Sequence, residues 1–297
     1  CNNLLIATYL SASCPVLIAP AMDLDMYNHP ATKKNIKKLS SYGNIILPVG
    51  EGFLASGLHG KGRMIEPEQL LKNVISYFNG SKPLSGKKIL ITAGPTFEPI
   101  DPVRYIGNYS SGKMGYELAK EAIRLGGKVK LIMGPNSLDL ESFEGDLIKV
   151  VTASEMFEQA ISNFEESTIV IAAAAVADFT PKNKLSSKIK KEDKLSKINL
   201  IPTKDILFEM GRIKKDQLLV GFALESNDEI NNAREKLKTK NLDAIILNSL
   251  NDKATGFGFD TNKITFIKKN GTSKPFKLKS KSDVAADIFN EIININE

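Results

Sequence analysis

Residues 89–115, ILITAGPTFEPIDPVRYIGNYSSGKMG, combine residue types that would bind a phosphate or a carboxylate. A short apolar run at 89–91 predicts a buried strand, and an apolar-periodic segment after Gly112 predicts a helix. The polar loop between them, 93–111, exceeds the about 2 to 6 residues that such a connection usually takes, which indicates a binding loop. Asn, Ser and Gly at its end suit a helix N-terminus, whose N–H groups and dipole attract anions. The residues alone leave one alternative open, a well-capped first helix of an α/β domain, since the pattern is neither GxGxxG nor the Walker motif.

The composition is typical of a globular protein large enough for two domains. The chain has 297 residues, of which 42% are hydrophobic and 25% charged. Its net charge of +6 reflects lysines concentrated at 182–197 and 263–281, with Phe266 and Phe276 the only aromatic residues in these two ranges, so a small anionic ligand is favoured over nucleic acid. Cys1 and Cys14 form no disulfide or zinc pattern, which indicates a reducing, cytoplasmic setting. No apolar run reaches the about 18 residues of a membrane span.

Strand and helix patterns alternate along the chain and predict an α/β fold in two domains, 1–80 and 87–297, joined by a linker at 81–86. The second domain is expected to hold a mostly parallel sheet with its ligand beyond the carboxyl ends of the strands. Its predicted elements are strands at 88–92, 128–133, 147–151, 168–174, 218–222 and 244–247, a hairpin around Asn270-Gly271 and a helix at 282–292. Those of the first domain are strands at 15–21 and 45–49, helices at 30–42 and 67–78, and a glycine-rich loop at 50–64.

Separated motifs in a fixed order resemble one enzyme family. The loop motif above, AAAAVADF at 172–179, KIKK at 188–191 and GFALES at 221–226 resemble the phosphopantothenate-cysteine ligase domain of bifunctional bacterial coenzyme A biosynthesis proteins. Upstream, APAMDLDMY at 19–27 and LASGLHGKGRM at 54–64 resemble the carboxyl-terminal half of the phosphopantothenoylcysteine decarboxylase domain of the same proteins. The resemblance implies a Rossmann-like ligase domain preceded by part of a flavodoxin-like flavoprotein domain, in an amino-terminally truncated chain.

The resemblance also implies a reaction. CTP activates the carboxylate of 4'-phosphopantothenate as an acyl-cytidylate and releases pyrophosphate, and the amine of cysteine then displaces CMP. Such chemistry needs cations around the triphosphate, usually Mg²⁺ among them, and hydrogen-bond donors for the acyl and phosphate oxygens. Family members pair as ligase dimers and use FMN for the decarboxylation, so a homo-oligomer with CTP, Mg²⁺ and FMN is expected.

Matching motif positions suggest residues for each role. Asn108 is expected to hydrogen-bond the carbonyl of the acyl-cytidylate, although Asn is also a good helix cap. Arg104 would pair with a phosphate or carboxylate. Lys188, ten residues after Asp178 on a flap at 181–201, would neutralise phosphates, whereas composition alone indicates a solvated basic loop. The resemblance places the nucleotide against Ala174, Ala175, Asp178, Lys188, Lys204, Asp205, Phe222, Lys236 and Lys240. Metal ligands are not indicated.

Two departures from the family's pattern affect the decarboxylase half. Asp23 stands where the family has Asn, and Ser56 where it has a reactive Cys. A hydroxyl is a much weaker acid than a thiol, so Ser56 is expected to be a poor proton donor. The resemblance also places the family's flavin-binding glycine motif and catalytic histidine upstream of this sequence, so the chain is not expected to decarboxylate on its own. Two other functions fit a strand, loop and helix pattern: an NAD(P)-dependent Rossmann oxidoreductase and a non-catalytic nucleotide-binding domain. The oxidoreductase would need an acidic or basic ribose-binding residue after the second strand, and 128–133 ends without one.

Overall fold

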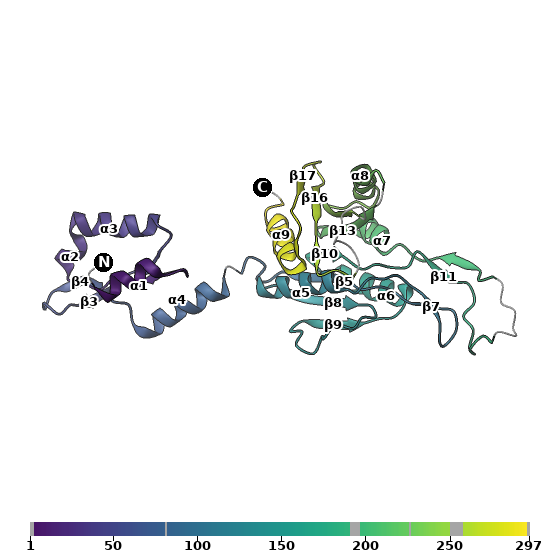
Figure 1. The fold of residues 1–297 in the computed structure, drawn as a ribbon, viewed down its shortest axis with the longest axis horizontal. Coiled ribbons are helices and arrows are strands. Elements are labelled where there is room, and N and C mark those ends of the chain that lie inside the picture. The colour runs from purple at the N-terminus through teal and green to yellow at the C-terminus, as the bar shows by residue number, and fades with distance from the viewer. Residues whose placement is uncertain (1–2, 81, 191–196, 226, 250–257, 296–297) are drawn as a thin grey trace. The chain divides into compact units, whose positions relative to one another are not determined.

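The computed structural model describes residues 3–80, 82–190, 197–225, 227–249 and 258–295. It divides into two compact units, Cys1–Ser81 (unit 1) and Lys82–Glu297 (unit 2) (Figure 1). None of the helices in the described ranges is long and apolar enough to cross a membrane.

Unit 1 consists of short elements with few buried side chains. A two-stranded parallel sheet and an antiparallel hairpin accompany four helices: α1(Leu4–Ser11), β1(Leu17–Ile18), α2(Leu24–Asn28), α3(Pro30–Ser41), β2(Ile45–Ile46), β3(Gly50–Phe53), β4(His59–Arg63) and α4(Pro67–Asn79). The segment 50–64, predicted to be a loop, is therefore largely the β3–β4 hairpin. Glycine was read as a loop signal, but here it allows close packing: a Cβ on Gly62, at φ +148°, would lie 2.3 Å from the carbonyl oxygen of Met22.

Unit 2 is built on an eight-stranded sheet in the order β17-β16-β14-β13-β10-β5-β8-β9. Six neighbouring strands are parallel, and β16 and β17 pair antiparallel at one edge. The strands are β5(Lys88–Ala93), β8(Lys128–Met133), β9(Asp146–Lys149), β10(Ile169–Ala172), β13(Leu218–Glu225), β14(Ala244–Ser249), β16(Ile264–Lys268) and β17(Ser273–Pro275). The predicted hairpin around Asn270-Gly271 is the β16–β17 turn.

Helices cover both faces of this sheet, which explains why its central strands read as continuous apolar runs. Along β5, Ile89 and Ile91 face the core under α5(Lys113–Arg124) and α9(Lys281–Ile293), while Leu90 faces the core under the other helices. Those are α6(Ala153–Phe164), α7(Ile206–Ile213) and α8(Glu229–Thr239). Full burial of a residue such as Leu90 contributes about 1.5–3 kcal/mol, so the sheet and its two helical layers carry most of the stability.

The order of the parallel strands identifies where a ligand should bind. In chain order the six strands lie third, second, first, fourth, fifth and sixth across the sheet, the arrangement of a Rossmann fold. The direction of connection reverses between β5 and β10, and ligands bind in the crevice beyond the strand ends at that point. The predicted fold class, an α/β protein with a Rossmann-like mostly parallel sheet, is confirmed.

Two small hairpins project from this end of the sheet. The long loop after β5 contains β6(Glu98–Pro99) paired with β7(Tyr105–Ile106). The segment after β10 forms an arm whose base is β11(Phe179–Pro181) paired antiparallel with β12(Leu200–Pro202). Residues 191–196 of the predicted flap at 181–201 lie outside the described residues.

Candidate active site

Close glycine packing fixes the start of α5 against the ends of β5 and β8. A Cβ on Gly115 would lie 2.4 Å from the Cβ of Ala93, and one on Gly134 would lie 1.8 Å from the carbonyl oxygen of Pro95. Gly94 and Gly112 have φ of +81° and +76°, a region that favours glycine. The helix N-terminus therefore comes close to the carboxyl edge of the sheet, where its positive dipole end faces the crevice.

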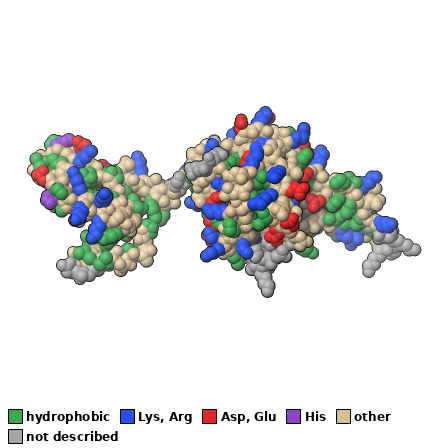
Figure 2. All heavy atoms as spheres, turned by 90° about the horizontal axis from the view of Figure 1, so that it is seen from above, with side chains coloured by type: hydrophobic (Ala, Val, Ile, Leu, Met, Phe, Trp, Pro, Cys, Tyr) green, Lys and Arg blue, Asp and Glu red, His purple; other side chains and the backbone are tan. Residues whose placement is uncertain are grey.

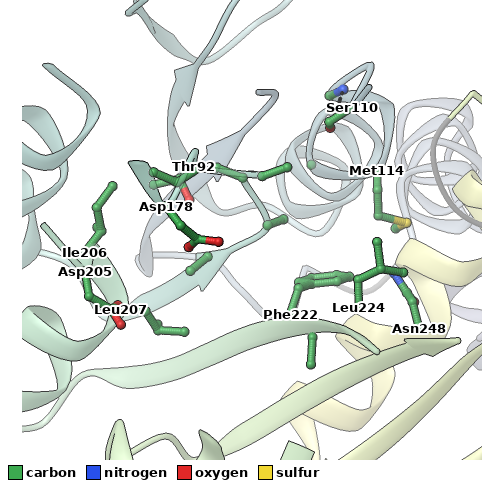
Figure 3. Close-up of a pocket in the computed structure, with 18 of the residues that line it drawn as sticks. Thr92, Ser110, Met114, Asp178, Asp205, Ile206, Leu207, Phe222, Leu224 and Asn248 are labelled. Atoms are coloured by element: carbon green, nitrogen blue, oxygen red, sulfur yellow. Dashed lines mark hydrogen bonds between the residues drawn. The ribbon is translucent and has the colours of Figure 1, made fainter. Parts of the chain in front are cut away.

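A pocket of about 560 Å³ occupies this crevice between β5, β10, β13 and the starts of α5 and α7. Figure 3 shows Thr92 and Asp178 on one side, Phe222 and Leu224 across from them, and Ser110 with Met114 towards α5. The volume falls in the range of small-molecule sites. Small side chains at 172–175 leave the backbone accessible from the pocket.

Hydrogen bonds join the long loop to the segment that follows β10. The backbone N–H of Ala175 donates to the carbonyl of Gly94 at 2.9 Å, and that of Ala177 donates to Thr96 Oγ1 at 3.0 Å. The side-chain amide of Asn108 donates to the carbonyl of Ala175. Asn108 is thus not a helix cap, because the N-cap of α5 is Gly112. Its amide instead lies beside a backbone segment that lines the pocket.

A buried carboxylate, Asp101, ties the same loop to the arm. It accepts hydrogen bonds from the backbone N–H groups of Val103 and Arg104, both at 2.8 Å, and from that of Ile189 at 3.1 Å. The Arg104 guanidinium also donates to Asp101, and its Nη2 donates to the carbonyl of Ile189 at 2.8 Å. The Arg104 side chain, followed by these backbone donors, holds the pKa of Asp101 well below its ordinary value despite burial.

The structure separates the residues predicted from sequence into two groups. Ala174, Ala175, Asp178, Lys204, Asp205, Phe222 and Lys240 line the pocket. Arg104 and Lys188 lie on the joined loop and arm outside the pocket lining; Lys188 is exposed and adjoins the Ile189 backbone held by Asp101. Lys236 forms an ion pair with Glu225 at 2.5 Å and does not line the pocket.

The charges at the α7 end of the pocket are largely paired. Lys240 contacts Asp205 at 2.8 Å, and Asp205 also caps α7 through the N–H of Phe208. The ammonium of Lys204 lies over the ring of Phe157, 4.8 Å from its centre. This end of the pocket suits a polar, uncharged group better than a triphosphate.

The pocket residues that the sequence-based site prediction did not include comprise, among others, Lys113, Asn248, Asn262 and Lys281. The amide of Asn262 is buried and donates to Asn248 Oδ1 at 3.3 Å. Lys113 stands inside the motif SSGKMG, so its position carried a signal. Lys281 lies at the end of the basic run 263–281, yet it is buried at the start of α9.

The described residues contain no group of three His, Cys, Asp or Glu side chains that could hold a metal ion. Asp178 is a single carboxylate at the pocket. This donor set fits Mg²⁺ held mainly by phosphate oxygens and water, which is how Mg²⁺ binds at many nucleotide sites.

Asp23 and Ser56, the two positions of unit 1 that depart from the family's pattern, form hydrogen bonds with residues close to them in the sequence. Asp23 caps α2, accepting from the N–H of Leu24 at 2.6 Å. Ser56 is exposed in the turn of the β3–β4 hairpin, where its Oγ accepts from the N–H of Leu58 at 3.4 Å.

Comparisons with known proteins agree with the two-unit division. Residues 84–295 match the family model described as DNA/pantothenate metabolism flavoprotein C-terminal domain, and residues 1–79 match the flavoprotein model. The coenzyme A biosynthesis bifunctional protein CoaBC of Bacillus subtilis (strain 168) is 46% identical over 100% of this chain and 73% of its own length. The chain belongs to the CoaBC family.

Two further similarities help to place this CoaBC family member. A crystal structure of the C-terminal domain of a CoaBC protein is 38% identical, with a TM-score of 0.62, over 72% of this chain and 98% of that one. A relative from an unknown prokaryotic organism, 54% identical over 99% of this chain and 83% of its own length, carries the name cysteine/cysteine sulfinic acid decarboxylase. The chain is accordingly a coenzyme A biosynthesis enzyme with a flavoprotein segment in unit 1.

Proposed function

We propose that unit 2 catalyses the CTP-dependent ligation of 4'-phosphopantothenate to cysteine through an acyl-cytidylate. The observation that carries the proposal is the pocket at the point where the strand order reverses. It is lined by motif residues on both sides, and α5 and α7 both begin at its edge. An anionic nucleotide suits this arrangement because helix N-termini and nearby lysines stabilise phosphates.

The two ends of the pocket suit different parts of CTP. Phe222 offers an apolar wall for the base, and the paired Lys240 and Asp205 offer polar groups at the α7 end. Asp178, which is exposed, is placed to accept from a ribose hydroxyl or to hold hydrated Mg²⁺. Mg²⁺, when bound, would supply positive charge to the triphosphate.

The joined loop and arm would handle the acyl group. Asn108 is already oriented by its bond to the Ala175 carbonyl at the pocket edge, and we propose that its amide also binds the carbonyl of the acyl-cytidylate. Arg104 is held by Asp101 and would pair with an anionic group of 4'-phosphopantothenate. Lys188 directly precedes Ile189, whose backbone N–H donates to Asp101, and we propose that its ammonium neutralises the phosphates.

Pairing of two ligase units is also proposed. Large apolar side chains are exposed on the β6–β7 hairpin, on the loop that follows it and on the arm, including Val103 (60%), Tyr105 (52%), Tyr109 (92%), Phe179 (52%) and Leu185 (44%). Hydrophobic side chains are visible at this end of unit 2 in Figure 2. Clusters of exposed apolar side chains often mark interaction sites. A dimer would bury it, and sedimentation of the chain at micromolar concentration would measure the mass directly; a monomer would contradict the pairing.

For unit 1, FMN is the cofactor expected of a flavoprotein domain. Ser56 offers a hydroxyl where the family has a more acidic thiol, so we expect this chain not to decarboxylate 4'-phosphopantothenoylcysteine. The 54% identity to the protein named cysteine/cysteine sulfinic acid decarboxylase favours a second candidate activity, loss of CO₂ from cysteine or its sulfinate. Release of labelled CO₂ from carboxyl-labelled cysteine, without nucleotide, tests it.

Steady-state pyrophosphate release tests the ligase proposal. The chain is supplied with 4'-phosphopantothenate, cysteine and either CTP or ATP. Release with CTP that depends on 4'-phosphopantothenate supports the proposal, and stronger release with ATP would contradict the nucleotide preference. Absence of release with both nucleotides would sink the ligase function and favour the non-catalytic alternative.

A further inference from the structure

A second buried carboxylate on the long loop, Glu98, has no part in the site described above. It is 2% exposed and is the first residue of β6. Its Oε1 accepts a hydrogen bond at 2.8 Å from the backbone N–H of Ala153, the first residue of α6. The backbone N–H of Phe97 donates to the carbonyl of Val151 at 2.8 Å. Two consecutive loop residues are therefore bonded to the segment that begins α6.

The start of α6 is already capped by residues of its own segment. Thr152 Oγ1 accepts from the N–H of Glu155 at 3.2 Å, and Glu155 Oε2 accepts from the N–H of Val151 at 2.7 Å. These reciprocal bonds resemble a capping box. Burial of a carboxylate is costly unless it is hydrogen-bonded. Because α6 has its own caps, we interpret the bond from Ala153 to Glu98 as an anchor for the loop.

The β6–β7 hairpin carries this anchor along the loop. Glu98 pairs with Ile106 in the ladder between the two strands. The rings of Phe97 and Tyr105 are stacked, with their centres 3.8 Å apart. Gly107 packs against the same ring, since a Cβ there would lie 2.9 Å from Cδ1 of Phe97. The backbone that follows β7 is thus positioned by contacts with the residues beside the anchor.

Asn108 lies directly after this packed segment. Its amide donates to the carbonyl of Ala175 at the pocket edge. Asp101, in the turn between β6 and β7, bonds the hairpin to the arm through the N–H of Ile189. The hairpin is therefore held by Glu98 at its strands and by Asp101 at its turn.

We propose that Glu98 is a positioning residue for the ligation, because its bond to α6 fixes the hairpin that places the Asn108 amide at the pocket. Glu98 does not line the pocket, so it acts through Asn108. The inference rests on the proposed function, which assigns Asn108 to the carbonyl of the acyl-cytidylate. Loss of the anchor should slow pyrophosphate release and leave CTP affinity little changed, since Phe222 and the α7 end lie on other elements.

The test compares three variants of the full chain by single-turnover pyrophosphate release and by calorimetric binding of CTP. Glu98→Met removes the acceptor with little change in volume, and Glu98→Gln keeps an acceptor oxygen. Thr152→Val is the matched control, because it removes a cap from the same helix end, and the Thr152 hydroxyl bonds within the α6 segment. A displacement of about 1 Å at a reacting group slows turnover by up to about 100-fold. We expect a 10- to 100-fold slower release for Glu98→Met, by the same estimate, and near-parent rates for the other two.

A double-mutant cycle with Asn108→Ala shows whether the effect is transmitted through Asn108. The double variant Glu98→Met with Asn108→Ala should be no slower than Asn108→Ala alone, because coupled residues are not additive. Multiplied losses would overturn the proposed route. A parent rate in Glu98→Met, or an equal loss in Thr152→Val, would overturn the positioning role.

Backbone hydrogen exchange over residues 97–108 gives a readout that does not depend on activity. Glu98→Met should speed exchange in this segment, whereas Thr152→Val should speed it only at the start of α6. Unchanged exchange at 97–108 would refute the anchor and leave the ligase proposal standing. Faster exchange in a chain that releases no pyrophosphate would retain the anchor and refute the ligase function.

A second variant breaks the same bond from the helix if Glu98→Met does not fold. Ala153→Pro removes the backbone donor, and proline suits the first position of a helix. The ψ of 162° at Thr152 is compatible with a following proline. Ala153→Pro should reproduce the slower pyrophosphate release and the faster exchange at 97–108. Parent values of both would overturn the proposal.

Discussion

Substitution of Gly115 by alanine should disable the proposed ligase site by displacing the start of α5. The new Cβ would lie 2.4 Å from the Cβ of Ala93 and 3.2 Å from its Cα, whereas ordinary contacts begin near 3.4 Å. Relief of the first contact therefore requires movement of about 1 Å between helix and strand. Ala93 is fully buried in the central strand β5, so the helix is the element that must move.

The expected magnitudes follow from this displacement. Overpacking of a tight core contact costs about 1–3 kcal/mol. For a domain the size of unit 2, each 1 kcal/mol lowers the midpoint of thermal unfolding by about 2–4 °C. A misplacement of about 1 Å at a site that positions reacting groups reduces turnover by on the order of 100-fold. The rate of pyrophosphate release should therefore fall by much more than the small loss of folding stability alone would cause.

A double substitution provides the control. Ala93→Gly removes the atom that the new Cβ would strike, so Ala93→Gly with Gly115→Ala should recover pyrophosphate release relative to Gly115→Ala alone. Calorimetric unfolding and pyrophosphate release are measured on all three variants and the parent chain. Full activity of Gly115→Ala, or no recovery in the double variant, would refute the claim that close packing of α5 on β5 positions the site.

Three other substitutions test the charge of Asp101 in the loop, the ammonium of Lys188 on the arm and the ring of Phe222 as a contact for the base. The pKa of Asp101 is lowered in the folded chain, so its charge stabilises the fold above the ordinary value of 3.8 and this contribution is lost as the pH falls. The gap in unfolding free energy between the parent and Asp101→Asn should therefore be constant from pH 7 to about pH 5 and shrink below about pH 4 in urea titrations; a gap that widens in acid would contradict the assignment. Lys188→Gln should reduce pyrophosphate release at least about tenfold, with CTP affinity less affected, whereas Lys182→Gln on the same arm should not; equal effects would indicate a general charge effect. Phe222→Ala should weaken CTP binding by about 5- to 100-fold if the base packs on the ring, and unchanged affinity would place the base elsewhere.

The parallel sheet could be predicted from sequence because its strands are buried on both faces. An apolar run such as Ile89–Ile91 predicts a buried parallel strand when helical segments alternate with such runs. Polar or small residues directly after these strands then lie at one edge of the sheet. Ala174 and Asp178, which the resemblance placed against the nucleotide, follow β10 at this edge, and both line the pocket. Phe222 entered the prediction through the family motif and lies in the same lining.

Other features depend on contacts between distant segments that local patterns do not encode. Lys281 is buried on α9, which packs beside α5, although its basic neighbourhood in the sequence resembles a solvated surface. Asp101 joins the long loop to the arm by accepting a hydrogen bond from the backbone N–H of Ile189, and no apolar pattern in the sequence predicts this contact. The β3–β4 hairpin was missed because its strands are held by backbone pairing, with glycine at Gly60 and Gly62 where close contact requires it.

A single-turnover experiment without cysteine tests the central claim most directly. The chain is mixed with 4'-phosphopantothenate and CTP labelled in the α phosphate, and pyrophosphate and labelled CMP are followed separately. The proposed mechanism predicts a burst of pyrophosphate close to one per site while the CMP label stays on the acyl product, and release of CMP only when cysteine is added. Inorganic phosphate in place of pyrophosphate, or CMP released together with pyrophosphate before cysteine is present, would contradict an acyl-cytidylate intermediate in this pocket.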